Sequence, residues 1–267
     1  MPAFRIAVLL VLFPRDALAW GLQTHVFYAQ GLLFALPLLD PGFRRAALAF
    51  PRLVLAGACL PDLALSAHLI GTRAFRRTHC WESLRRMVRG AACDEDRAIA
   101  LGYASHLLAD VVAHNYFVPE HERRIADLPH FTHALAEWAM DDYLAPHLMA
   151  SPWELMQGAR ECLADHAARN ARCPVALAIR SLELLAGADR VLRASRLPRF
   201  CRRISRAFDR ALAPRFETYV RETSLRLRHV GELLDGAEPP WDAEGAGGGH
   251  RRAFWGRGRL MLPARLV

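Results

Sequence analysis

Lysine is absent from this chain of 267 residues, so all 35 basic side chains are arginines, set against 27 acidic side chains. An arginine-only composition is typical of a GC-rich genome, and the net charge of +8 is therefore weak evidence for nucleic-acid binding. We predict no specific nucleic-acid partner, although the positive charge would still attract an anionic surface or substrate.

The chain also lacks, outside its N-terminal segment, any wholly apolar stretch as long as the roughly 20 residues that a membrane-spanning helix needs. The apolar run Ile6 to Phe13 has only eight residues and precedes Ala17-Leu18-Ala19, a small-residue cleavage pattern. We therefore expect residues 1–19 to be a signal peptide, Trp20 to begin the mature chain, and the protein to be secreted or periplasmic. The alternative is a short buried helix or an uncleaved anchor.

No CxxC pair is present. The six cysteines are spread along the chain, at Cys59, Cys80, Cys93, Cys162, Cys173 and Cys201. An even number suits an oxidising compartment, but the pattern does not reveal which cysteines would pair. Cys80 adjoins His79 and could supply a thiolate ligand, whereas a disulfide or a buried thiol is the commoner state without paired ligand spacing.

Alternating β-branched runs and hairpin dipeptides are nearly absent, whereas apolar residues recur at spacings of three and four. This pattern predicts an all-α fold, a multi-helix bundle. The expected helices cover about 24–38, 42–57, 81–90, 95–117, 130–148, 152–168, 174–195, 199–213 and 215–234. We expect one domain over residues 20–234, followed by a Gly/Arg-rich flexible tail over residues 235–267.

Arginines alternate with apolar residues between Phe200 and Leu234. Such a segment could contact anionic lipid through a basic face. Alternatively, it is an amphipathic core helix whose arginines are simply solvated.

Three potential metal ligands share one face of the expected helix 95–117. His106, Asp110 and His114 stand at i, i+4 and i+8, and each step of about 400° returns the side chain to nearly the same face, about 6 Å further along the axis. The neighbouring residues are apolar, which predicts that this helix is buried. Burying two imidazoles and a carboxylate is costly unless a cation binds them.

A second pair has the same helical spacing. His133 and Glu137 stand at i, i+4, with Asp141 one turn further on. Two such helices packed face to face can close two or more metal sites. Either pair alone could instead be a satisfied core histidine or a surface ion pair.

Further candidates stand singly in short motifs: His25 in Trp20-Gly21-Leu22-Gln23-Thr24-His25, Asp62 after Pro61, and His79 in Thr78-His79-Cys80-Trp81. A neutral N-terminal amine on Trp20 is a competent nitrogen ligand, so the cleavage prediction and the nearby histidine support each other. His130, one turn before His133, is a reserve ligand, and His68, 11 residues before His79, could take the place of His79.

The order WGxxTH, GxxxPD, THxW, GxxSHxxxDxxxH and HxxxE resembles the zinc-dependent phospholipase C superfamily. That superfamily also includes fungal single-strand nucleases and the catalytic domain of glycosylphosphatidylinositol-specific phospholipase D. The resemblance runs from Trp20 to about Asp142. The short interval between Asp110 and His114 is more similar to the glycosylphosphatidylinositol enzyme than to the bacterial phospholipases or the nucleases.

The resemblance implies three zinc ions in an all-α fold. One zinc would be held by His79, His106 and Asp110. A second would be held by the Trp20 amine and carbonyl, by His25 and again by Asp110, and the third by His114, His133 and Glu137. Asp62 matches an aspartate that is the general base in the phospholipases and an additional zinc ligand in the nucleases, so both roles stay open.

Phosphoester hydrolysis suits such a site, because clustered zinc ions can clamp phosphate oxygens, activate a water molecule and stabilise the leaving alkoxide. We expect an exported zinc-dependent phosphodiesterase that cleaves phospholipids in the phospholipase C manner. The alternatives are a single-strand nuclease on the same metal core and a non-catalytic, zinc-containing protein bound to an anionic envelope surface. The sequence does not indicate the lipid headgroup or the oligomeric state.

Overall fold

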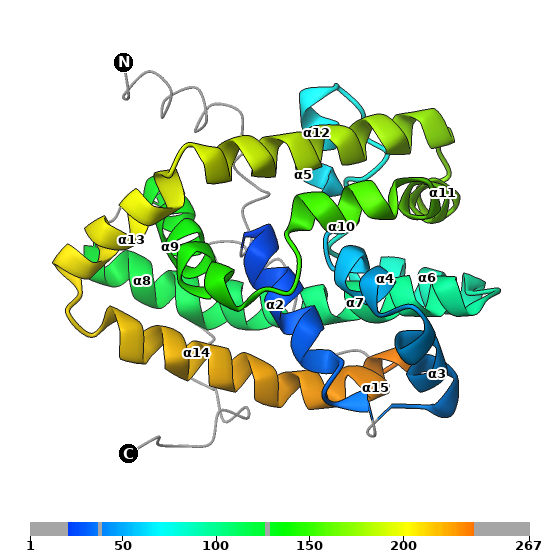
Figure 1. Cartoon of the computed structure of the whole chain (residues 1–267), viewed down its shortest axis with the longest axis horizontal. Coiled ribbons are helices and arrows are strands. Elements are labelled where there is room, and N and C mark those ends of the chain that lie inside the picture. The colour runs from blue at the N-terminus through cyan, green and yellow to red at the C-terminus, as the bar shows by residue number, and fades with distance from the viewer. Residues whose placement is uncertain (1–20, 37–38, 126–128, 238–267) are drawn as a thin grey trace.

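The computed structural model describes residues 21–36, 39–125 and 129–237, and within these ranges every regular element is helical (Figure 1). The all-α class is confirmed. The expected signal peptide, Trp20 and nearly all of the expected tail lie outside the described residues. The described part of the chain contains no helix that is both long enough and apolar enough to span a bilayer.

The α-helices, in chain order, are α2 (Leu22–Leu32), α3 (Pro41–Ala49), α4 (Pro51–Gly57), α5 (Leu63–Leu69), α6 (Trp81–Gly90), α7 (Asp94–Val112), α8 (Val118–Ile125), α9 (Pro129–Leu144), α10 (Pro152–Gly158), α11 (Arg160–Ala171), α12 (Val175–Ala194), α13 (Leu197–Phe208), α14 (Leu212–Arg226) and α15 (Val230–Leu234). A π-helical turn, Ala113–Phe117, joins α7 to α8.

Several expected helices are divided in the structure. The helix expected over 42–57 breaks at Phe50, because Pro51 lacks a backbone N–H and begins a new helix at its first position. The helix expected over 152–168 is also two helices, α10 and α11, which meet at Ala159. Helices α5 and α8 were not predicted from the sequence.

Helix α7 is the central element of the fold. Every residue from Ala98 to Val112 is buried, including both the apolar and the polar ones. Helices α2, α3, α4, α6, α14 and α15 all pack against it, and in Figure 1 it runs through the middle of the molecule beneath α2. A helix covered on all sides belongs to the core, so its polar side chains face protein and not solvent.

Two glycines let α4 and α7 pack with their backbones in contact. A Cβ atom on Gly102 would overlap the carbonyl oxygen of Val54, and one on Gly57 would overlap the carbonyl oxygen of Ile99. Only glycine fits at such a close approach of two backbones. The contact places the end of α4 one helical turn from His106.

We predict that Gly102→Ala lowers the free energy of unfolding by roughly 1–3 kcal/mol, because the added methyl group meets a backbone carbonyl that cannot rotate away. The matched control is Gly187→Ala in α12, where a Cβ would meet nothing within 4 Å. That change should raise the free energy of unfolding by up to about 1 kcal/mol, since alanine favours helix over glycine. Urea unfolding of both variants measures the difference, and two stabilised variants would contradict the close packing.

Candidate metal centre

Five ionisable side chains from four separate segments meet beside α7. His106 and Asp110 come from α7 itself, His25 comes from α2, Asp62 follows α4, and His79 precedes α6. His25, His106 and Asp110 are completely buried, and Asp62 and His79 are 2% and 5% exposed. The structure thus brings together five of the residues that the sequence motifs singled out.

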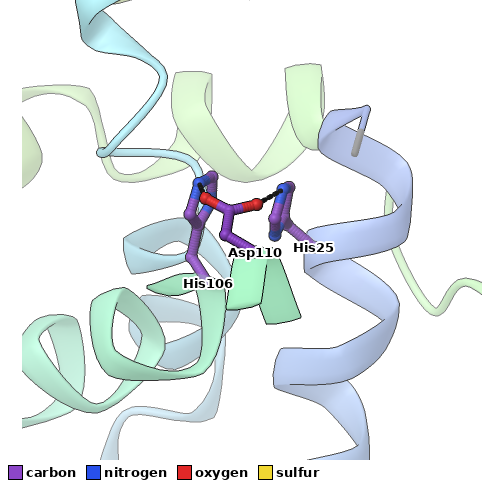
Figure 2. Close-up of side chains that lie close together, drawn as sticks. All are labelled: His25, His106 and Asp110. Carbon is purple, nitrogen blue, oxygen red and sulfur yellow. Dashed lines mark ion pairs between the residues drawn. The ribbon is translucent and has the colours of Figure 1, made fainter. Parts of the chain in front are cut away.

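Asp110 lies between imidazoles on both sides of its carboxylate. Its Oδ1 is 3.3 Å from His25 Nε2, and its Oδ2 is 3.0 Å from His106 Nε2 and 3.7 Å from His79 Nε2. The rings of His25 and His106 stack, with centroids 3.5 Å apart and planes 12° from parallel. Figure 2 shows the Asp110 carboxylate with one oxygen directed to each of these two rings. The motif resemblance implied that Asp110 bridges two zinc ions, and the structure places imidazoles near both of its oxygens.

Asp62 forms a second group with His79 and His106. Its Oδ1 is 3.3 Å from His79 Nε2 and 3.9 Å from His106 Nε2, and the two Nε2 atoms are 3.2 Å apart. Two triads therefore have all their candidate ligand atoms within 4.8 Å of one another: His25, His106 and Asp110, and Asp62, His79 and His106. His106 belongs to both.

A hydrogen bond to the backbone determines the tautomer of His106, and so which of its ring nitrogens offers a lone pair to the cluster. Its Nδ1 is 2.7 Å from the carbonyl oxygen of Ala58, which can only accept, so Nδ1 carries the proton and donates it. The Nε2 atom then presents a lone pair to the cluster, as a metal-bound histidine does when its other nitrogen is held by a carbonyl.

Three of the four carboxylate oxygens of the cluster have no hydrogen-bond donor among the described residues. Asp62 Oδ1 and both oxygens of Asp110 are buried and accept no hydrogen bond from the described residues. Lone pairs of two carboxylates therefore converge with the lone pair of His106 Nε2. A divalent cation would satisfy all of them, and this set of nitrogen and oxygen donors fits zinc.

The electrostatics of the region also favour a cation. Burial raises the pKa of Asp110, because its charged form loses hydration; His106 opposes this effect, and the charge of Asp62 adds to it. Burial likewise raises the pKa of Glu137 well above its usual range, with Asp62 and Asp110 acting in the same direction. Both shifts mean that the ionised forms of these carboxyl groups are penalised in the interior, and a bound cation would relieve that penalty.

A second polar group lies where α7 ends. His133 Nε2 is 2.6 Å from Glu137 Oε1, and the ring of His114 is 5.4 Å from the ring of His133, centroid to centroid. His114 sits in the π-helical turn, an irregularity often found at functional sites. Glu122 of α8 is the additional acid here, with Oε1 3.9 Å from His133 Nδ1. Sequence reasoning missed Glu122 because it did not predict α8.

Three other sequence candidates are not placed. Trp20 lies outside the described residues, and so do the side chains of His68 and His130.

Asp141 fixes the start of α2, the helix that carries His25. Its Oδ1 accepts hydrogen bonds from the backbone N–H of Thr24 at 2.9 Å and from the Thr24 hydroxyl at 2.7 Å, and its Oδ2 accepts one from Arg193. A Cβ atom on Gly21 would overlap this carboxylate, so the position requires glycine. Asp141 therefore caps a helix that has no side-chain cap of its own.

Arg193, in α12, also bonds Asp189 through its Nε atom at 3.0 Å. It is a supporting residue that the sequence reasoning missed. No spacing rule links it to Asp141, which precedes it by 52 positions.

The family model described as zinc dependent phospholipase C matches residues 24–180, a range that includes every candidate ligand except Trp20. A search of curated proteins found no match to the chain. A search of solved structures also found none.

We predict that Arg193→Met lowers the free energy of unfolding by about 3–5 kcal/mol, because it leaves the buried carboxylate of Asp141 without its charged partner. The control is Arg180→Met on the exposed side of α12, expected to change it by no more than about 0.5 kcal/mol. Denaturant unfolding measures both. The same small effect in the two variants would show that Arg193 does not support Asp141.

Proposed function

Because the chain belongs to the zinc-dependent phospholipase C family, we propose that it is an exported phosphodiesterase that cleaves phospholipids into diacylglycerol and a phosphorylated headgroup. The observation that carries the proposal is the pair of buried triads that share His106. Their donors are of the type that zinc prefers, and three of their four carboxylate oxygens have no hydrogen-bond donor among the described residues.

When bound, zinc supplies an activated water and a positive charge that holds phosphate oxygens and the leaving alkoxide. The protein's own residues prepare the site for it. Ala58 holds His106 in the tautomer that presents Nε2, and Asp110 spans the two sides of the cluster. Asp62, with an unbonded oxygen toward His79, is placed to accept the proton of a water held there.

The proposed number of zinc ions is three per chain. His79, His106 and Asp110 would hold the first, and Asp110 would share the second with His25 and Trp20. His114, His133 and Glu137 would hold the third, which is supported by the close contact between His133 and Glu137. The Glu122 carboxylate lies beside this third group and adds negative charge to it.

The outer face of α13 supports contact with an anionic lipid surface. The inner face packs on α9 and buries Cys201 and Ser205, as expected of an amphipathic core helix. The outer face, by contrast, exposes Arg199, Arg203 and Arg206 together with Phe200, which is 52% exposed. Arginines around an exposed aromatic ring are typical of a helix that lies on an anionic membrane surface. We propose that this face contacts the bilayer.

We predict that the zinc-loaded protein, beginning at Trp20, releases diacylglycerol and phosphorylated headgroups from vesicles of phosphatidylcholine, phosphatidylethanolamine and phosphatidylglycerol. Asp62→Asn should lower the rate by roughly 10²- to 10⁴-fold, the range expected for loss of a proton acceptor. The control is Asp165→Asn, a change of an exposed carboxylate on α11, which should leave the rate unchanged.

Single-stranded DNA is the parallel substrate in this assay. Release of nucleotides, without diacylglycerol, would move the chain to the nuclease alternative. Absence of both products from a sample that contains zinc would support the non-catalytic alternative.

We predict that the protein co-sediments with phosphatidylglycerol vesicles more strongly than with phosphatidylcholine vesicles, and less at high salt. Arg203→Gln should weaken the partition by about fivefold, since one arginine near an anionic surface contributes about 1 kcal/mol. Phe200→Ser should weaken it as well, whereas Phe34→Ser, at an 81% exposed position outside α13, should not. Equal losses from the two phenylalanine variants would argue against α13 as the membrane face.

A further inference from the structure

A hollow that includes none of the candidate metal ligands lies between α6, α7 and α11. It encloses about 390 Å³ of empty space, including a part open to solvent. Leu63, Phe75 and Met87 form apolar walls, and Arg77 and Arg86 line it with two guanidinium groups. We call it the Arg86 pocket.

The lining of the Arg86 pocket contains no acid to balance these two positive charges. Glu82, the one acid of α6, bonds its Oε2 to Arg85 at 2.6 Å and its Oε1 to Arg89 at 3.2 Å. Asp96 of α7 is likewise occupied, by His166 and Arg169. Glu82 and Asp96 are therefore committed to other partners.

Arg86 has donors that the described residues leave unused. Its Nη2 donates to the Ser83 hydroxyl at 3.2 Å, but its Nε is buried and has no acceptor among the described residues. The hydroxyl groups of the wall are used elsewhere: Ser83 and Tyr103 donate to backbone carbonyls, and Thr78 donates to the carbonyl of Pro61 at 2.5 Å. A buried charged donor without an acceptor costs free energy that an anion would recover.

We propose that the Arg86 pocket binds a phosphate group, with phosphate oxygens accepting hydrogen bonds from the guanidinium group of Arg86. Guanidinium groups can bind phosphate through two parallel hydrogen bonds. Arg77 supplies the second positive charge, which matches a phosphate dianion better than a single carboxylate. The apolar walls strengthen the attraction by excluding water.

The pocket adjoins the metal centre along the chain. Thr78, in its wall, precedes His79, and Leu63 follows Asp62. The bound phosphate is either inorganic phosphate or the phosphorylated headgroup that hydrolysis would release. Only the second source rests on the proposed function; phosphate binding itself does not.

The test is calorimetric titration of the zinc-loaded protein with inorganic phosphate and, separately, with phosphocholine. Because a zinc centre can bind phosphate too, the same titrations are made with His106→Ala, which should retain the phosphate site that depends on Arg86. Arg86→Met should weaken that site at least tenfold. The matched control is Arg89→Met, one turn away on the same helix and pointing to Glu82, and it should bind as the unchanged protein does.

The second variant is Arg77→Met, which changes an exposed side chain and so remains informative if Arg86→Met does not fold. It should weaken phosphate binding several-fold. Tighter binding of phosphocholine than of phosphate would identify the headgroup as the occupant, and the reverse would identify inorganic phosphate. Unchanged phosphate affinity in both Arg86→Met and Arg77→Met would overturn the proposal, as would an equal loss in Arg89→Met. Neither result would bear on phospholipid hydrolysis, which is measured separately.

Discussion

The burial of the Asp110 carboxylate among three imidazoles is the constraint on which the rest of this structure depends. Neither of its oxygens has a hydrogen-bond donor among the described residues, and Asp62 adds a second buried carboxylate beside it. Protein groups alone leave this arrangement costly, because lone pairs face lone pairs in a medium of low dielectric constant. A bound divalent cation reverses the sign of that interaction, which is why membership of a zinc-dependent family and the geometry of the cluster agree.

The surrounding fold holds these ligands from several directions. The glycine contact between α4 and α7 brings the Ala58 carbonyl to His106. The close packing of these two helix backbones therefore determines the tautomer of the His106 imidazole. Asp141 caps α2 and thereby positions His25, and Arg193 compensates the charge of Asp141 from α12. The matched family region ends at residue 180, so Arg193 shows that the part of α12 beyond it also supports the residue that caps α2.

The sequence predicted the parts of this arrangement that depend on local periodicity. The all-α class and the burial of the helix with His106 and Asp110 follow from apolar spacing and from the i, i+4 interval, and the structure confirms both. Short helices such as α5 and α8 were missed because a few turns carry little periodic signal. The contacts of Arg193 and Arg86 could not be foreseen, since they depend on tertiary packing between segments far apart in the chain.

The central claim is that a metal ion occupies the space between Asp110, His106 and their neighbours. The most direct measurement is a crystal structure of the protein grown with zinc, with anomalous diffraction recorded on both sides of the zinc absorption edge. We expect an anomalous peak within about 2.0–2.2 Å of His106 Nε2 and of an Asp110 oxygen. A well-ordered crystal with the same side-chain arrangement and no peak at this position, despite zinc in the medium, would contradict the claim.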